Sequence, residues 1–182
     1  MASRLTVVEP LAAVVGGELA RVRAPVWALW PLPLGWTFAG FAHDGNAALG
    51  QPAGCTVASW LGTDPFDEPV EMLLVCEEPG AAVGSRFAGV GTGYPSAGVG
   101  EGAPHARFTI GGRPVPLWVV DGRPDRAAYA GEAAGRWLWV IVHPAEASAL
   151  VVQPISLVDA RTLGAEIATL PVAELSPRLM LD

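Results

Sequence analysis

The chain contains no lysine, and its 11 cationic side chains are all arginines scattered along 182 residues. Acidic side chains outnumber them, so the net charge is −7. Nucleic acids are bound through clustered basic side chains that displace counterions from phosphates. Anionic membrane surfaces attract the same side chains. The composition therefore argues against nucleic acids and membranes as partners.

Long apolar runs are also missing. No segment reaches the roughly 18 apolar residues of a membrane-spanning helix without a charge or a helix breaker. The first ten residues lack the apolar core of a secretory signal. By default we expect a cytoplasmic protein.

Cysteine and histidine are too sparse and too dispersed to predict a metal site. Cys55 and Cys76 lie on separate apolar segments, and neither has a second cysteine at metal-ligand spacing. The three histidines occur outside the paired motifs that bind zinc. We expect two buried, reduced thiols, with a disulfide between neighbouring strands as the alternative. No metal and no other cofactor is predicted.

What the chain does have is material for a core, because 51% of its residues are hydrophobic and only 16% are charged. This composition and length are typical of a single globular domain. Within it we expect an N-terminal helix in residues 1–24, a sheet-rich body over 25–155, and a C-terminal helix and tail over 156–182.

Hydrophobic periodicity and turn residues predict the elements. Strands are expected at 36–42, 55–61, 70–77, 106–110, 113–120, 136–143 and 150–153, and helices at 10–22, 80–90 and from Ser156 onward, where Ser156 and Asp159 have the spacing of a capping signal. The run 136–143 is almost wholly apolar, which indicates a central strand covered on both faces. Most connections are too short for parallel crossovers. The prediction is an α+β fold, with a mainly antiparallel, curved sheet and packed N- and C-terminal helices.

Proline positions indicate sheet margins. Gly111-Gly112 predicts a two-residue hairpin turn, which fixes the register of the strands on either side. In that register, Pro114 and Pro116 turn their missing N–H groups away from the partner strand. We therefore interpret residues 113–120 as an edge strand. Pro31 and Pro33 have the same spacing and predict a second margin.

Polar residues give no catalytic motif. Asp64, Asp67, Glu68 and Glu71 fall in one stretch, which favours a solvated turn over a cation site. Glu77-Glu78 closes a strand and is expected to face solvent. The glycine-rich run 89–93 lacks the spacing of a phosphate-binding loop, and we interpret it as an ordinary flexible loop. His105, Asp125, Arg126 and Glu132 would form a polar group only if folding brought them together.

Tryptophan is abundant, with seven in the chain. Three of them fall in the proline-rich stretch 25–36, which reads PVWALWPLPLGW. If Trp27 and Trp30 were exposed they would form an apolar patch suited to a partner. If buried, they would cap the open end of the sheet. We favour burial, because aromatic side chains usually bury their large surface.

Several segments resemble a known family. They are the stretch 25–36, GRPVPLW at 112–118, YAGEAAGRWLW at 129–139 and LSPRL at 175–179. In this order, over about residues 8–180, they look like an actinobacterial family of uncharacterised proteins, the domain of unknown function 6758. Members carry a zinc-ribbon-like N-terminal segment with paired cysteines, and this sequence begins after its position. The resemblance implies a bacterial cytoplasmic protein and brings no established activity or catalytic residue.

Two functional hypotheses follow. The first is a non-enzymatic interaction module that presents Trp27, Trp30 and the 114–118 edge with Trp118 to a protein partner or a second copy. The second is a small-molecule-binding protein or enzyme, with an aromatic cleft between the sheet and residues 80–104 on which His105 and Arg126 converge. The sequence favours the first, and no catalytic residue is assigned.

Overall fold

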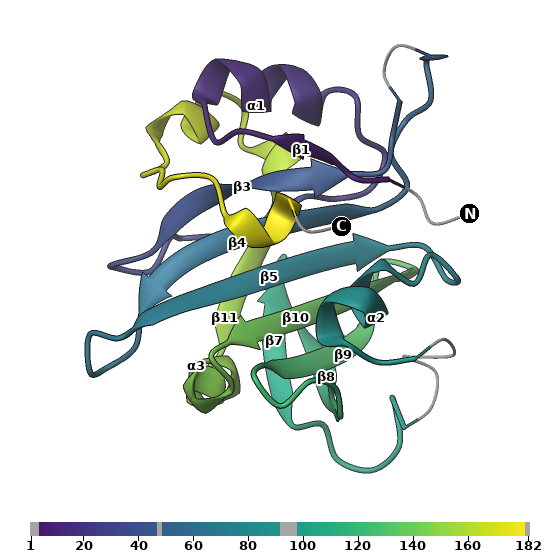
Figure 1. Ribbon diagram of the computed structural model, residues 1–182, viewed down its shortest axis with the longest axis vertical. Coiled ribbons are helices and arrows are strands. Elements are labelled where there is room, and N and C mark those ends of the chain that lie inside the picture. The colour runs from purple at the N-terminus through teal and green to yellow at the C-terminus, as the bar shows by residue number, and fades with distance from the viewer. Residues whose placement is uncertain (1–3, 47–48, 92–97, 181–182) are drawn as a thin grey trace.

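The computed structural model describes residues 4–46, 49–91 and 98–180. In this part of the chain ten strands form one sheet, in the order β1-β3-β4-β5-β10-β9-β8-β7-β11-β2 (Figure 1). Every neighbouring pair is antiparallel except β7 and β11. The predicted α+β class with a mainly antiparallel sheet is confirmed. The strands are β1 (Thr6–Val8), β2 (Trp27–Leu29), β3 (Thr37–His43), β4 (Thr56–Thr63), β5 (Pro69–Glu77), β7 (Ala106–Ile110), β8 (Arg113–Val120), β9 (Ala127–Ala133), β10 (Arg136–His143) and β11 (Ile155–Asp159).

Strand β10 is the central strand that its apolar sequence predicts. It pairs with β5 on one side and with β9 on the other, and residues 138–142 are all buried. Its alternate side chains enter two different hydrophobic clusters. Leu138 and Val140 belong to one cluster, called the inner core here. Trp139 and Ile141 belong to a second cluster on the opposite face of the sheet, called the outer core. A strand buried on both faces reads as a continuous apolar run for this reason.

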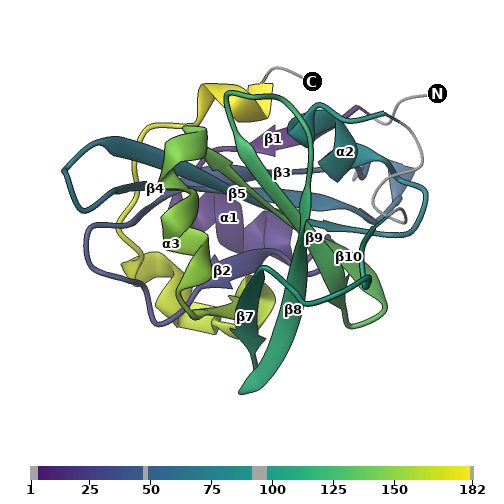
Figure 2. The same cartoon turned by 90° about the horizontal axis from the view of Figure 1, so that it is seen from below.

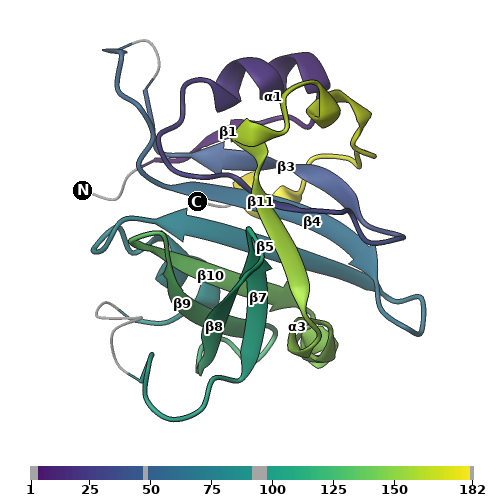
Figure 3. The same ribbon diagram turned by 180° about the vertical axis from the view of Figure 1, so that it is seen from behind.

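The sheet curls so that its β7–β11–β2 end crosses the other strands and encloses the inner core (Figures 1 and 3). The indole Nε1 of Trp60 in β4 donates a hydrogen bond of 3.2 Å to the carbonyl of Trp27 in β2. This contact joins strands from distant parts of the sheet order. Strand β2 ends the sheet, so the margin that Pro31 and Pro33 predict is confirmed.

Helices cover the ends and outer face of the sheet. Helix α1 (Ala12–Leu19) lies over β1, with Val15 and Leu19 buried beneath it, and confirms the first predicted helix at shorter length (Figure 1). Helix α2 (Val83–Ala88) packs on the outer core, and α3 (Ala149–Val152) lies near β7 (Figure 2). None of the described helices is long and apolar enough to cross a membrane.

Two predicted elements after residue 149 are wrong. Residues 150–153, expected as a strand, fall mostly in α3, and residues 156–159, expected as the start of a helix, belong to β11. Asp159 does cap a helical turn, but that turn follows it, because its carboxylate accepts from the backbone N–H of Arg161. In place of the expected C-terminal helix, the residues after β11 form short 3-10 turns (Ala160–Thr162 and Gly164–Thr169).

The hairpin prediction is confirmed and the edge prediction is wrong. Strands β7 and β8 pair in the expected register, with Ile110 opposite Arg113, and both turn glycines have positive φ. However, β8 also pairs with β9 and is therefore not an edge strand. That second ladder covers only Trp118–Val120, after the prolines. The missing N–H groups of Pro114 and Pro116 thus restrict pairing locally without ending the sheet.

Two glutamates of β5, Glu71 and Glu77, are buried. Glu77, expected in solvent, is buried, and its carboxylate accepts from the backbone N–H groups of Val83 (2.7 Å) and Gly84 (3.0 Å) and from Trp139 Nε1 (2.7 Å). Desolvation raises the pKa of Glu77, although these hydrogen bonds oppose the shift. The interactions hold α2 on the sheet. Of the predicted pair, only Glu78 is exposed.

Glu71, expected in a solvated turn, is likewise buried and holds the C-terminal segment. Ser59 Oγ donates to Glu71 at 2.7 Å, Ser176 Oγ donates to the same oxygen, and Arg178 forms an ion pair of 2.6 Å with the other. The Asp64 carboxylate instead accepts from the N–H groups of Phe66 and Glu68 within its own turn.

The two thiols are free and buried, as expected. Cys55 belongs to the outer core and Cys76 to the inner core, so the sheet separates them and the disulfide alternative is excluded. Burial raises the pKa of both thiols, that of Cys76 to about 12. Inert structural cysteines have this character.

A pair of glycine-to-alanine substitutions tests the packing of α2. A Cβ at Gly84 would lie 2.3 Å from the Trp139 ring, so Gly84→Ala should lower the free energy of unfolding by about 1–3 kcal/mol as α2 shifts. At Gly16 in α1 a Cβ meets nothing within 4 Å, so Gly16→Ala should raise it by about 1 kcal/mol. Urea denaturation measures both, and changes of the same sign would contradict this packing.

Candidate binding groove along strand β1

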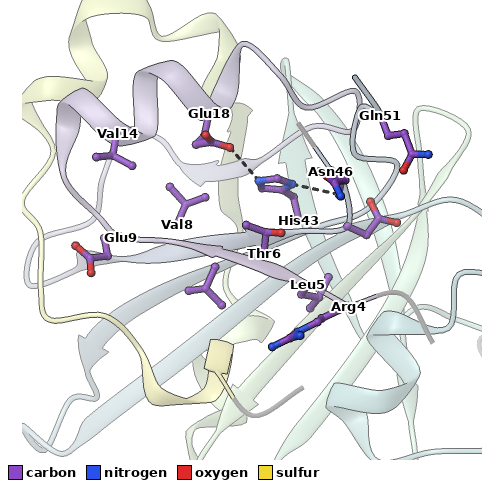
Figure 4. Close-up of a pocket in the computed structure, with 13 residues that line it drawn as sticks. Arg4, Leu5, Thr6, Val8, Glu9, Val14, Glu18, His43, Asn46 and Gln51 are labelled. Atoms are coloured by element: carbon purple, nitrogen blue, oxygen red, sulfur yellow. Dashed lines mark hydrogen bonds and ion pairs between the residues drawn. The ribbon is translucent and has the colours of Figure 1, made fainter. Parts of the chain in front are cut away.

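A groove of about 870 Å³ follows strand β1 at one end of the sheet (Figure 4). Three parts of the chain line it: the consecutive run 4–9, Val14 and Glu18 of α1, and His43 at the end of β3 with residues 44–46 and 51 of the β3–β4 connection. Residues 47–48 of that connection lie outside the described residues. Side chains along a strand alternate between its faces. Because every residue of the run borders the groove, the groove follows the edge of β1 rather than one face.

Glu18 and His43 form the polar centre of this groove, and Figure 4 shows the two side chains pointing toward each other. Glu18 Oε2 lies 3.1 Å from His43 Nε2, and the backbone N–H of Gly45 donates to His43 Nδ1 at 3.3 Å. A ring nitrogen that accepts a hydrogen bond carries no proton, so this geometry assigns the proton to Nε2, which donates to Glu18. His43 is itself buried and therefore orients the carboxylate.

The electrostatic character of the groove is negative. One arginine, Arg4, and three carboxylates, Glu9, Glu18 and Asp44, line it. Arg21 pairs with the other oxygen of Glu18, Oε1, at 3.3 Å, but this arginine is mostly exposed. Exposed ion pairs are weak and screened by salt. The groove thus suits a ligand with a positive charge.

The β3–β4 connection is held in place by Asp44. Its Oδ1 accepts from the backbone N–H groups of Gly54 (2.8 Å) and Cys55 (2.9 Å), just before β4 begins. One carboxylate oxygen that satisfies two backbone donors fixes the base of a loop. This anchor positions the wall of the groove opposite α1.

The tryptophans proposed as a binding surface have structural contacts instead. Trp27 is buried, and no described residue accepts a hydrogen bond from its indole Nε1. Trp30 is half-buried against the inner core, and its backbone N–H bonds to the carbonyl of Ser156. Trp118 is also half-buried, and its Nε1 donates to the carbonyl of Gly102 at 3.4 Å.

His105 and Arg126 do not converge on one site. His105 is exposed and lines a shallow pocket of about 280 Å³ with Arg107. Arg126 lines a different pocket, and its guanidinium donates hydrogen bonds to the Asp125 carboxylate and to the carbonyl of Phe87. Its guanidinium holds the pKa of Asp125 well below the usual range. Part of the predicted cleft region, residues 92–97, lies outside the described residues.

Sequence reasoning missed the groove. Glu18 and His43 are 25 positions apart and share no motif, so no spacing links them. One usable signal was the position of Glu18 on the helix. It lies between the buried Val15 and Leu19, at the border of the apolar face, where a carboxylate can reach a neighbouring strand.

The fold and the groove together define a small α+β protein with a curved sheet and a surface groove along one edge strand. Comparison with family models matches residues 3–179 to the Family of unknown function (DUF6758), and the chain belongs to that family. Neither the curated proteins nor the solved structures contain a match.

A double-mutant cycle tests the polar centre. Glu18→Ala and His43→Ala, singly and together, should give a coupling energy of about 1.5–3 kcal/mol, as expected for a hydrogen bond to a charged group. The matched cycle of Glu18 with the exposed Arg21 should give at most about 0.5 kcal/mol. Thermal or urea unfolding measures each free energy, and equal couplings in the two cycles would contradict the assigned roles.

Proposed function

We propose that this protein is a non-enzymatic binding module that takes a ligand with a cationic group into the groove along β1. The observation that supports this proposal best is the Glu18 carboxylate. It is held by the buried His43, it keeps 23% of its side chain exposed, and it faces a groove lined by three carboxylates against one arginine.

The chemistry of the groove supports binding over catalysis. Among the described residues that line the groove, Thr6 alone has a hydroxyl group, and none is a cysteine or a lysine. His43, the residue type that most often serves as a general base, has both ring nitrogens engaged, one by Glu18 and one by the N–H of Gly45. With both ring nitrogens in hydrogen bonds, His43 is placed to orient the Glu18 carboxylate.

The two surfaces favoured by the sequence are less well supported. In the stretch 25–36 the tryptophans are buried or half-buried, and Leu34 is the exposed large apolar residue. In the part of the proposed aromatic cleft beneath residues 83–88, α2 lies directly against the ring of Trp139 and fills the space between the two. A cytoplasmic location and a bacterial source stay predictions from the sequence.

A small cationic probe tests the proposed function. Nα-acetyl-arginine methylamide should shift the backbone NMR signals of residues 4–9, Glu18 and residues 43–46, with a dissociation constant of about 1 mM. Its citrulline counterpart has nearly the same shape without the charge, and it should bind at least about tenfold more weakly, because a charged hydrogen bond contributes 1.5–3 kcal/mol.

Two variants control this titration. Glu18→Gln should weaken binding of the arginine probe about tenfold, whereas Glu146→Gln, which removes the same charge from an exposed site outside the groove, should leave it unchanged. Equal binding of the arginine and citrulline probes, or equal loss in both variants, would refute the cationic site.

A further inference from the structure

Resting on the proposed function, we propose that the ligand of the groove is an extended segment of a partner protein. This segment adds to the sheet as a strand beside β1 and places an arginine or lysine side chain on Glu18. Strand addition of this kind draws its affinity from main-chain hydrogen bonds and its specificity from alternate side chains.

The first observation is that β1 is an unpaired edge. It stands first in the strand order and pairs only with β3, and no described strand lies on its other side. An edge strand presents a row of N–H and C=O groups that can pair with another chain. At β1 these groups border a groove, not a flat surface.

The shape of the groove matches an extended chain. Six consecutive residues, from Arg4 to Glu9, line the groove, and Thr6–Val8 among them form β1. At about 3.3 Å per residue this run is roughly 20 Å long. A free amine or guanidinium compound would occupy only the end at Glu18, whereas an extended segment would occupy the full length.

Two residues of α1, Val14 and Glu18, line the groove at a spacing close to that of alternate residues on a strand. Val14 is exposed and Glu18 is partly exposed on α1, and both line the groove. Residues four apart on a helix lie about 5–6 Å apart, and residues two apart on a strand about 6.6 Å. One face of an added strand can therefore place an apolar side chain on Val14 and a basic one on Glu18.

Charge supports a basic partner over a second copy of this chain. The protein carries a net charge of −7 and no lysine, so two copies repel each other. A basic segment would instead be attracted both by the whole protein and by the carboxylates of the groove.

The test is selection of peptides from a displayed library of random linear sequences on the immobilised full-length protein. The expected sequences share an arginine or lysine two positions from an apolar residue. Selected peptides are then synthesised with single N-methyl groups at successive backbone amides. In a strand beside β1, alternate amides face the edge, so N-methylation should weaken binding at least about tenfold at every second position and little in between.

Three variants complete the experiment. Glu18→Gln and Val14→Ser should each reduce peptide binding, and Glu146→Gln should not. Failure of the library to yield peptides that bind above the single-residue arginine probe would overturn this inference and leave the proposed function standing. If N-methylation weakened binding without alternating between successive amides, this inference would likewise be overturned and the proposed function would stand. Failure of the arginine probe as well would overturn both, and selected sequences without a basic residue would overturn the charge assignment.

Discussion

The carboxylate of Glu71 is the contact that ties the C-terminal segment, the sheet and the groove together. It accepts from Ser59 on β4 and from Ser176, and it pairs with Arg178. Just before these contacts the segment runs along β3, where the N–H of Ser176 donates to the carbonyl of Ala39. A buried carboxylate with this many partners is costly to disturb, because loss of one partner leaves the others unsatisfied.

Gly40 links the C-terminal segment, which Glu71 holds, to the strand that borders the groove. The pairing of β3 with β4 is irregular between Phe38 and Phe41, and Gly40 has φ +102° at this bulge. A Cβ there would lie 2.8 Å from the carbonyl oxygen of Val8 on β1 and 2.6 Å from Leu175. Only glycine lets the C-terminal segment, β3 and β1 approach so closely. The edge that borders the groove is therefore set by contacts on the opposite side of β1.

Much of this fold was predictable from the sequence, because local patterns report burial. The apolar run of β10 and the glycine pair between β7 and β8 each have one physical interpretation. The run at 155–159 does not, since a short apolar segment fits strand or helix equally and its pairing with β7 is set by the tertiary fold. The burial of Glu71 and Glu77 was unpredictable for a related reason, because Glu71 meets Ser176 and Glu77 meets Trp139 only after the chain has folded. Glu18 and His43 meet only after folding, so the site could not be found from spacing.

We propose the outer edge of β1 as the binding surface of this protein. The most direct measurement is a crystal structure of the protein with a library-selected peptide. We expect the peptide to lie extended beside β1, hydrogen-bonded to its backbone, with a basic side chain on the Glu18 carboxylate. A peptide bound over Trp30 or Trp118, or bound as a helix, would contradict it.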